Sequence, residues 1–222
     1  MKTEIVFGAT SGIGKEISEL LLKDGYRVAI TGRRLGKLEA LKKQYSNQVY
    51  VAQNDIQKVY ELENVFNEII KEFTTIDIII QSSGVGHINP TLAWNKEEET
   101  IFTNVVGATK LYDLSFNLFR NQGFGHLVGI TSIASIRGNR GAPAYFSSKA
   151  YQKAYLESLY MKTKTIKSNL VFITDIRPGF VDTAMALGNV FSGWFLLKKQ
   201  QNKFIQQLRK RKELLTYLSD GG

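Results

Sequence analysis

Short runs of branched apolar residues alternate along the chain with longer amphipathic stretches, and this alternation restricts the fold more than any other feature. Runs such as residues 4–7 and 76–80 are mostly apolar, which is typical of strands buried on both faces. The stretches between them repeat apolar residues at helical spacing, as at Ile13, Ile17 and Leu20. The expected strands span residues 4–7, 27–30, 49–52, 76–80, 126–130 and 169–173, and the expected helices span residues 13–24, 35–45, 57–73, 97–120 and 144–165.

This order of elements predicts an α/β fold, a single Rossmann-type, doubly wound parallel sheet with helices on both faces. In such a sheet, ligands bind beyond the carboxyl ends of the strands, where the strand order reverses. A final apolar segment at residues 214–218 is a candidate edge strand, so we expect about seven strands. A chain of 222 residues can form a substantial core, and we predict a single domain over residues 1–222.

The residue types that the chain lacks exclude several kinds of chemistry. It has no cysteine, which rules out disulfides, thiolate metal sites and cysteine nucleophiles, and its two histidines offer little for a metal site, so no metal is expected. No run reaches the ~18 apolar residues of a membrane-spanning helix. The amino terminus leads directly into the first strand and leaves no room for a signal peptide, so we expect a cytoplasmic location.

The chain carries 29 basic and 20 acidic residues, and this excess of +9 is compatible with nucleic acid, an anionic membrane or an anionic ligand. The densest basic segment, residues 198–212, alternates with Phe204, Ile205 and Leu208 at helical spacing. It predicts a basic amphipathic helix whose charges form a solvated face. We therefore expect no nucleic-acid partner, and an acidic partner for this helix stays as the alternative.

A glycine-rich turn joins the first expected strand to the first expected helix. A phosphate placed there would meet unpaired backbone N–H groups and the positive end of the helix, and glycine allows a close backbone approach. The spacing is G-x-x-x-G-x-G, which differs from the dinucleotide motif G-x-G-x-x-G, and a purely structural turn is the alternative. The expected cofactor contacts in this turn are Gly8, Thr10, Ser11, Gly12, Ile13 and Gly14.

Two arginines follow the second expected strand, in Thr31-Gly32-Arg33-Arg34. An NAD-selective site places a carboxylate at this strand end to bind the ribose 2′-hydroxyl, whereas arginine suits a 2′-phosphate. The sequence therefore favours NADP(H) over NAD(H), with Arg33 as the first choice for the phosphate contact. Arg34 is the second choice or stacks on adenine, and a solvated arginine pair is the alternative reading.

Tyr145 and Lys149 stand four residues apart in an expected helix, so their β-carbons lie about 5–6 Å apart on one face. A phenol titrates near pH ~10 and exchanges protons poorly at neutral pH. A neighbouring cation favours the phenolate, so we expect Lys149 to lower the pKa of Tyr145 and make it a usable acid and base.

Together these motifs resemble the short-chain dehydrogenase/reductase family over nearly the whole chain. The family's glycine turn, T-G-x-x-x-G-x-G, is matched except that Phe7 replaces the threonine, and its N-N-A-G motif is matched only at Gly84 of Gln81-Ser82-Ser83-Gly84. The remaining motifs occur in family order at Asn54-Asp55-Ile56, at Asn104, at Ser132 in Ile130-Thr131-Ser132-Ile133-Ala134, at Tyr145 with Lys149, and at Pro178-Gly179-Phe180-Val181-Asp182-Thr183.

The resemblance implies a role for each matched residue. Tyr145 is the general acid in carbonyl reduction and the general base in alcohol oxidation, and Lys149 tunes it and binds the ribose of the nicotinamide. Ser132 binds the substrate oxygen, and Asn104 holds a water that connects Lys149 to solvent. The further implied cofactor contacts are Asp55, Ile56, Ser83 and Gly84, and, near the nicotinamide, Pro178, Gly179, Val181 and Thr183.

The function implied by the resemblance is an NADP(H)-dependent oxidoreductase that interconverts a secondary alcohol and a carbonyl, as a homodimer or homotetramer. A non-catalytic NADP-binding regulatory or interaction protein is the alternative. We expect residues 137–143 and a substrate lid at residues 183–197 to line the substrate pocket. Apolar lid residues favour an apolar substrate, or they belong to the core or to a dimer contact, and Arg137 and Arg140 favour a carboxylate, so the small-molecule substrate stays undefined.

Overall fold

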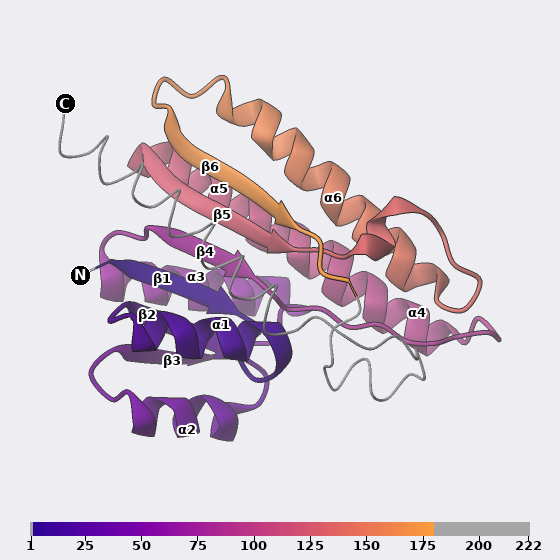
Figure 1. Cartoon of the computed structure of the whole chain (residues 1–222), viewed down its shortest axis with the longest axis horizontal. Helices are drawn as coiled ribbons and strands as arrows, with labels where there is room; N and C mark the ends of the chain where they lie inside the picture. The colour runs from indigo at the N-terminus through magenta and orange to yellow at the C-terminus, as the bar shows by residue number, and fades with distance from the viewer. Residues whose placement is uncertain (1, 180–222) are drawn as a thin grey trace.

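The computed structural model describes residues 2–179, which form a parallel sheet with helices on both faces (Figure 1). The sheet has the order β3-β2-β1-β4-β5-β6, and every pair of neighbouring strands is parallel. The strands are β1 (Thr3–Phe7), β2 (Arg27–Gly32), β3 (Val49–Gln53), β4 (Ile78–Gln81), β5 (Phe124–Ile130) and β6 (Leu170–Ile176). The predicted Rossmann-type fold is confirmed, with six strands in the described residues, and the candidate strand at 214–218 lies outside them.

The helices follow the sequence pattern closely, with one exception. They are α1 (Gly12–Lys23), α2 (Leu35–Gln44), α3 (Val59–Phe73), α4 (Trp94–Ile101), α5 (Ala108–Gln122) and α6 (Pro143–Thr163), with a 3-10 turn η2 (Ile133–Ile136). The stretch expected as one helix at 97–120 begins earlier and contains a π-helical turn, η1 (Phe102–Gly107), between α4 and α5. Insertions of this kind are frequent at functional sites.

Two rows of apolar side chains cross the sheet and separate its two faces. Val6 of β1 lies opposite Ile30 and Ile80, and this row packs with α1 and α2. Its neighbour Ile5 lies opposite Ala29 and Ile79, and that row packs with α3, α5 and α6. Burying a Val or Ile side chain fully stabilises the fold by roughly 1.5–3 kcal/mol. Successive residues of β1 point to opposite faces of the sheet, so the alternation along β1 determines which helices cover which face.

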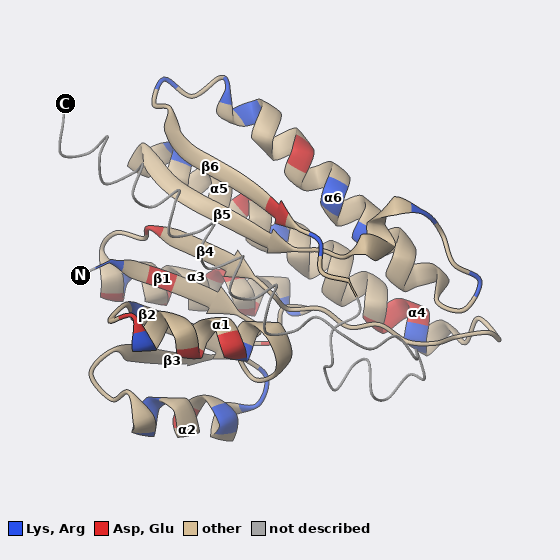
Figure 2. Cartoon of the chain, in the orientation of Figure 1, with Lys and Arg blue, Asp and Glu red and all other residues tan. Residues whose placement is uncertain are grey.

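The strand order reverses at β1, which lies between β2 and β4. The loops after β1 and β4 therefore diverge at the carboxyl edge, and this is where a doubly wound sheet binds ligands. Lys and Arg are interspersed with Asp and Glu along the helices in Figure 2, and the basic segment at 198–212 lies outside the described residues. None of the helices between residues 2 and 179 is long and apolar enough to cross a membrane.

Candidate active site

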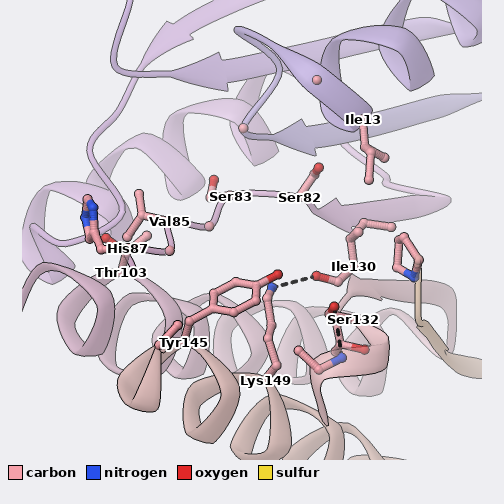
Figure 3. A pocket seen from close by; sticks show the side chains of 18 of the residues that line it. Ile13, Ser82, Ser83, Val85, His87, Thr103, Ile130, Ser132, Tyr145 and Lys149 are labelled. Atoms are coloured by element: carbon pink, nitrogen blue, oxygen red, sulfur yellow. Dashed lines mark hydrogen bonds between the residues drawn. The ribbon is translucent and has the colours of Figure 1, made fainter. Parts of the chain in front are cut away.

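A cavity of about 550 Å³ opens at the carboxyl edge of the sheet, between the loops after β1, β2 and β4 on one side and α6 on the other (Figure 3). It gathers nearly all the residues singled out from the sequence. Those that line it are Gly8, Thr10, Ser11, Gly12, Ile13, Arg33, Arg34, Asp55, Ile56, Ser83, Gly84, Ser132, Tyr145, Lys149, Pro178 and Gly179. Gly14 and Asn104 do not line the cavity. Val181, Thr183 and the expected lid at 183–197 lie outside the described residues.

The glycine turn brings the loop after β1 against the loop after β4. Gly8 has φ +91°, and a β-carbon on it would lie 2.6 Å from the Ser83 backbone nitrogen. A β-carbon on Gly14 would lie 2.3 Å from the Gly8 carbonyl oxygen. Only glycine permits this approach, which leaves the unpaired N–H groups at the start of α1 beside the cavity. The turn therefore fits the phosphates of a dinucleotide.

The two arginines at the end of β2 have different partners. Arg34 folds back over the glycine turn, and its Nη2 donates hydrogen bonds to Thr10 Oγ1 and Ser11 Oγ, both at 2.6 Å. Arg33 is half-exposed, and its Nη1 lies 3.6 Å from Oε1 of Glu99 on α4. Both guanidinium groups border the cavity where the adenosine end of a dinucleotide would lie, and among the residues at this strand end there is no carboxylate.

Glu99 is a site residue that the sequence reasoning missed. Its second carboxylate oxygen lies 2.7 Å from Nε2 of His87, which lines the cavity in the loop after β4. One carboxylate thus joins Arg33 to His87. The sequence gives no local signal for this cluster, because its members come from three separate segments: the loop after β2, the loop after β4 and α4.

Tyr145 stands in the first turn of α6 with its ring against the loop after β4. A β-carbon on Gly86 would lie 2.5 Å from Tyr145 Cδ2, so Gly86 makes room for the ring. Burial raises the pKa of Tyr145, and a hydrogen bond with Ser132 partly offsets this by lowering it. This differs from the sequence-based expectation, in which the Lys149 charge lowers the pKa, because burial removes the water that would stabilise a phenolate.

Lys149 is buried and directed by two acceptors. Its Nζ donates to the Ile130 carbonyl oxygen at 3.1 Å and to Gln152 Oε1 at 2.9 Å, and lies 5.9 Å from the centroid of the Tyr145 ring. Burial lowers the pKa of Lys149 to about 8, partly offset by the carboxylate of Asp175, which raises it. Lys149 therefore loses its proton more readily than an ordinary lysine.

Asn104 lies in the π-helical turn, and its side chain ties three segments together. Its Oδ1 accepts from the Val85 backbone N–H at 2.9 Å, and its Nδ2 donates to the Val85 carbonyl at 2.7 Å and to Ser148 Oγ at 3.0 Å. The Asn104 carbonyl accepts from Gln152 Nε2 at 2.8 Å. Asn104 thus fixes the loop that carries Gly84 and Gly86, and a glutamine that the sequence reasoning missed stands between its carbonyl and Lys149.

Ser132 ends the segment after β5 in an extended conformation and caps η2. Its Oγ accepts a hydrogen bond from the Ala134 N–H at 3.1 Å. This bond holds the hydroxyl at the cavity wall, on the side of Tyr145 (Figure 3). Within residues 2–179 no group of three or more His, Asp or Glu side chains is placed to hold a metal ion.

Comparisons with known proteins identify the family. A family model described as short chain dehydrogenase matches residues 2–189. An uncharacterized oxidoreductase of Myxococcus xanthus is 31% identical over 202 residues, covering 89% of this chain and 79% of the relative. An NADP-dependent 3-hydroxy acid dehydrogenase of Escherichia coli is 29% identical over 180 residues, covering 80% of this chain and 71% of the relative.

A solved structure supports the fold in the same way. An alcohol dehydrogenase from the archaeon Thermococcus sibiricus, complexed with 5-hydroxy-NADP, superimposes with a TM-score of 0.80 at 24% identity, covering 95% of this chain and 91% of that one. The chain therefore belongs to the short-chain dehydrogenase family and is an oxidoreductase.

Proposed function

We propose that this protein is an NADP(H)-dependent oxidoreductase that interconverts a secondary alcohol and a carbonyl compound. The observation that carries the proposal is the meeting of Ser132, Tyr145 and Lys149 at one wall of a cavity whose other end carries the glycine turn and two arginines. When bound, the nicotinamide supplies the hydride donor or acceptor.

The residues of the chain would supply binding and proton transfer. Ser132 donates a hydrogen bond to the substrate oxygen and favours its negative charge, and Tyr145 gives that oxygen a proton in reduction or removes one in oxidation. The raised pKa of Tyr145 suits the neutral phenol, which is the acid form. Lys149 places a positive charge beside Tyr145 and binds the hydroxyls of the nicotinamide ribose.

The preference for NADP(H) rests on Arg33 and Arg34, since arginine suits a phosphate dianion and neither β2 nor the two residues after it include an acidic side chain. The NADP dependence of the Escherichia coli relative points the same way. Glu99 partly opposes this preference for NADP(H), because the Glu99 carboxylate is already paired with Arg33.

The direct test is to mix the protein with NADPH or NADH and a panel of carbonyl compounds that includes 3-oxo acids and apolar ketones, and to follow nicotinamide absorbance. We expect turnover with at least one carbonyl compound, and a higher kcat/KM with NADPH than with NADH. Tight NADPH binding without turnover across the panel would instead favour a non-catalytic binding protein.

A further inference from the structure

We propose that Gln152 is a positioning residue of this site: its side-chain amide sets the orientation and the charge of Lys149 by joining it directly to the Asn104 backbone carbonyl. The catalytic role of Gln152 in this inference rests on the proposed function. The hydrogen bonds that support it involve only the Gln152 amide, the Lys149 ammonium and the Asn104 carbonyl.

The amide bridges two groups of opposite hydrogen-bonding character. Oε1 of Gln152 lies 2.9 Å from Lys149 Nζ, and Nε2 lies 2.8 Å from the Asn104 carbonyl oxygen. An ammonium group only donates and a carbonyl oxygen only accepts, so this orientation of the amide is the one that satisfies both. The reverse orientation would place donor against donor and acceptor against acceptor.

The amide of Gln152 and the ammonium of Lys149 are shielded from water, so water cannot replace either as a hydrogen-bond partner. Gln152 is completely buried and Lys149 is 5% exposed. A buried polar side chain in the middle of a helix is destabilising unless its hydrogen bonds are made, so the two bonds of Gln152 define its position. Gln152 lies three residues after Lys149 on α6, which places both on one helix face.

The bridge also determines where Lys149 points. An ammonium has three N–H donors. The Ile130 carbonyl and Gln152 Oε1 accept two of them, which leaves one for the cavity that Lys149 shares with Tyr145. The Gln152 amide stands between the Asn104 carbonyl and Lys149 Nζ, and the water that the family resemblance implies at Asn104 stays a prediction.

The charged and titratable groups around Lys149 are few. Tyr145 lies on the same helix, and Asp175 on β6 raises the pKa of Lys149. Asp175 itself binds Arg177 Nε at 2.5 Å and accepts a hydrogen bond from Thr131.

Two acidic side chains on the helices packed against α6 have partners other than Lys149. Glu97 of α4 accepts from the Ala144 backbone N–H at 3.1 Å, and Asp113 of α5 accepts from Tyr155. Gln152 is therefore the polar side chain whose change acts on Lys149 by direct contact.

Two substitutions at this position predict opposite effects on Lys149. Gln152→Leu removes the acceptor from a buried ammonium, so the pKa of Lys149 falls. Gln152→Glu has the same shape and places a carboxylate at the ammonium, so the pKa rises. A role limited to packing would not produce shifts of opposite sign.

The experiment titrates Lys149 by NMR in protein carrying ¹³C at the lysine ε-carbons, with the resonance assigned by its loss in Lys149→Met. We expect a midpoint near pH 8 in the wild type, lower by about one unit in Gln152→Leu and higher by about one unit in Gln152→Glu, each a tenfold change in the protonation constant. The matched control is Gln48→Leu, since Gln48 also bridges two groups, the carbonyls of Leu22 and Tyr26. It should leave the midpoint unchanged.

The titration needs no turnover, so it decides the inference even if the proposed reaction fails. An unmoved midpoint in folded Gln152→Glu overturns the inference, as do shifts of the same sign in both variants. If Gln152→Leu does not fold, the isosteric glutamate decides alone. In an active enzyme, the pH profile of kcat should shift with the Lys149 midpoint.

Discussion

Gly86 lies so close to the Tyr145 ring that a β-carbon on the glycine would approach Tyr145 Cδ2 to 2.5 Å. The loop after β4 therefore forms one side of the slot that holds the phenol. Because proton transfer depends on the position of the hydroxyl, this contact links the backbone of a loop to the chemistry of the site.

Gly86→Ala tests this contact. The added methyl displaces the ring, and we expect kcat to fall by about 10- to 100-fold while the KM for the cofactor changes little, since a displacement near 1 Å at a reacting group has effects of this size. Steady-state kinetics at saturating cofactor measure it. Gly36→Ala is the control, because a β-carbon on Gly36 meets nothing within 4 Å. A wild-type kcat in Gly86→Ala would show that the slot does not position the phenol.

Lys149 makes stability depend on pH in a defined window. Its pKa is about 8 in the folded protein against an ordinary value of 10.5, so between these values the unfolded chain binds more protons and stability rises with pH. Below pH 8 the full cost of burying the charge is present. Compared with Lys149→Met, the wild type should gain about 2 kcal/mol in its free energy of unfolding between pH 7 and pH 9.5. Urea titrations at both pH values measure this, and a difference independent of pH would contradict it.

Arg33 and Arg34 should separate the two nicotinamide cofactors. Alanine at either position removes charge-assisted hydrogen bonds to a 2′-phosphate, so we expect the Kd for NADPH to rise about tenfold or more. The Kd for NADH, which has no such phosphate, should change little. Fluorescence titration with both cofactors measures the ratio, and an equal loss for both would show that these arginines support the fold or the shared phosphates instead.

Glu99 should weaken the same preference. Its carboxylate lies 3.6 Å from Arg33, and because both side chains are partly exposed, the pair contributes little to stability. Glu99→Gln therefore leaves the fold intact, frees Arg33 and lowers the Kd for NADPH by about two- to fivefold. Glu98→Gln, a change at the neighbouring exposed carboxylate, is the matched control. Weaker NADPH binding in Glu99→Gln would show that the carboxylate orients Arg33 for the phosphate.

The strands and most helices could be predicted because their signal is local. Branched apolar runs and helical periodicity record which side chains are buried, and burial determines the sheet. The start of α4 is less predictable, since it depends on a side chain in the preceding loop. Asn89 binds both the N–H and the carbonyl of Ala93, at 2.9 and 3.0 Å, immediately before the helix.

The site was predictable where a motif fixes both residue type and spacing, as at the glycine turn and at Tyr145 with Lys149. Gly86 and Glu99 were missed because their partners come from other elements, and Gln152 was missed because the Asn104 carbonyl that it binds lies in η1. Gln152 alone had a usable signal, a polar residue three positions after Lys149 on the same helix face. The pKa of Tyr145 was predicted in the wrong direction, because the spacing reveals the neighbouring charge but not the burial of the phenol.

Whether Tyr145 transfers the proton is decided by Tyr145→Phe. The substitution removes one hydroxyl and keeps the ring that packs on Gly86. With a carbonyl that the wild type reduces, we expect kcat to fall at least about 100-fold, the scale of a general acid, while the Kd for NADPH stays close to wild type. A variant that oxidises NADPH at close to the wild-type rate would show that another group supplies the proton.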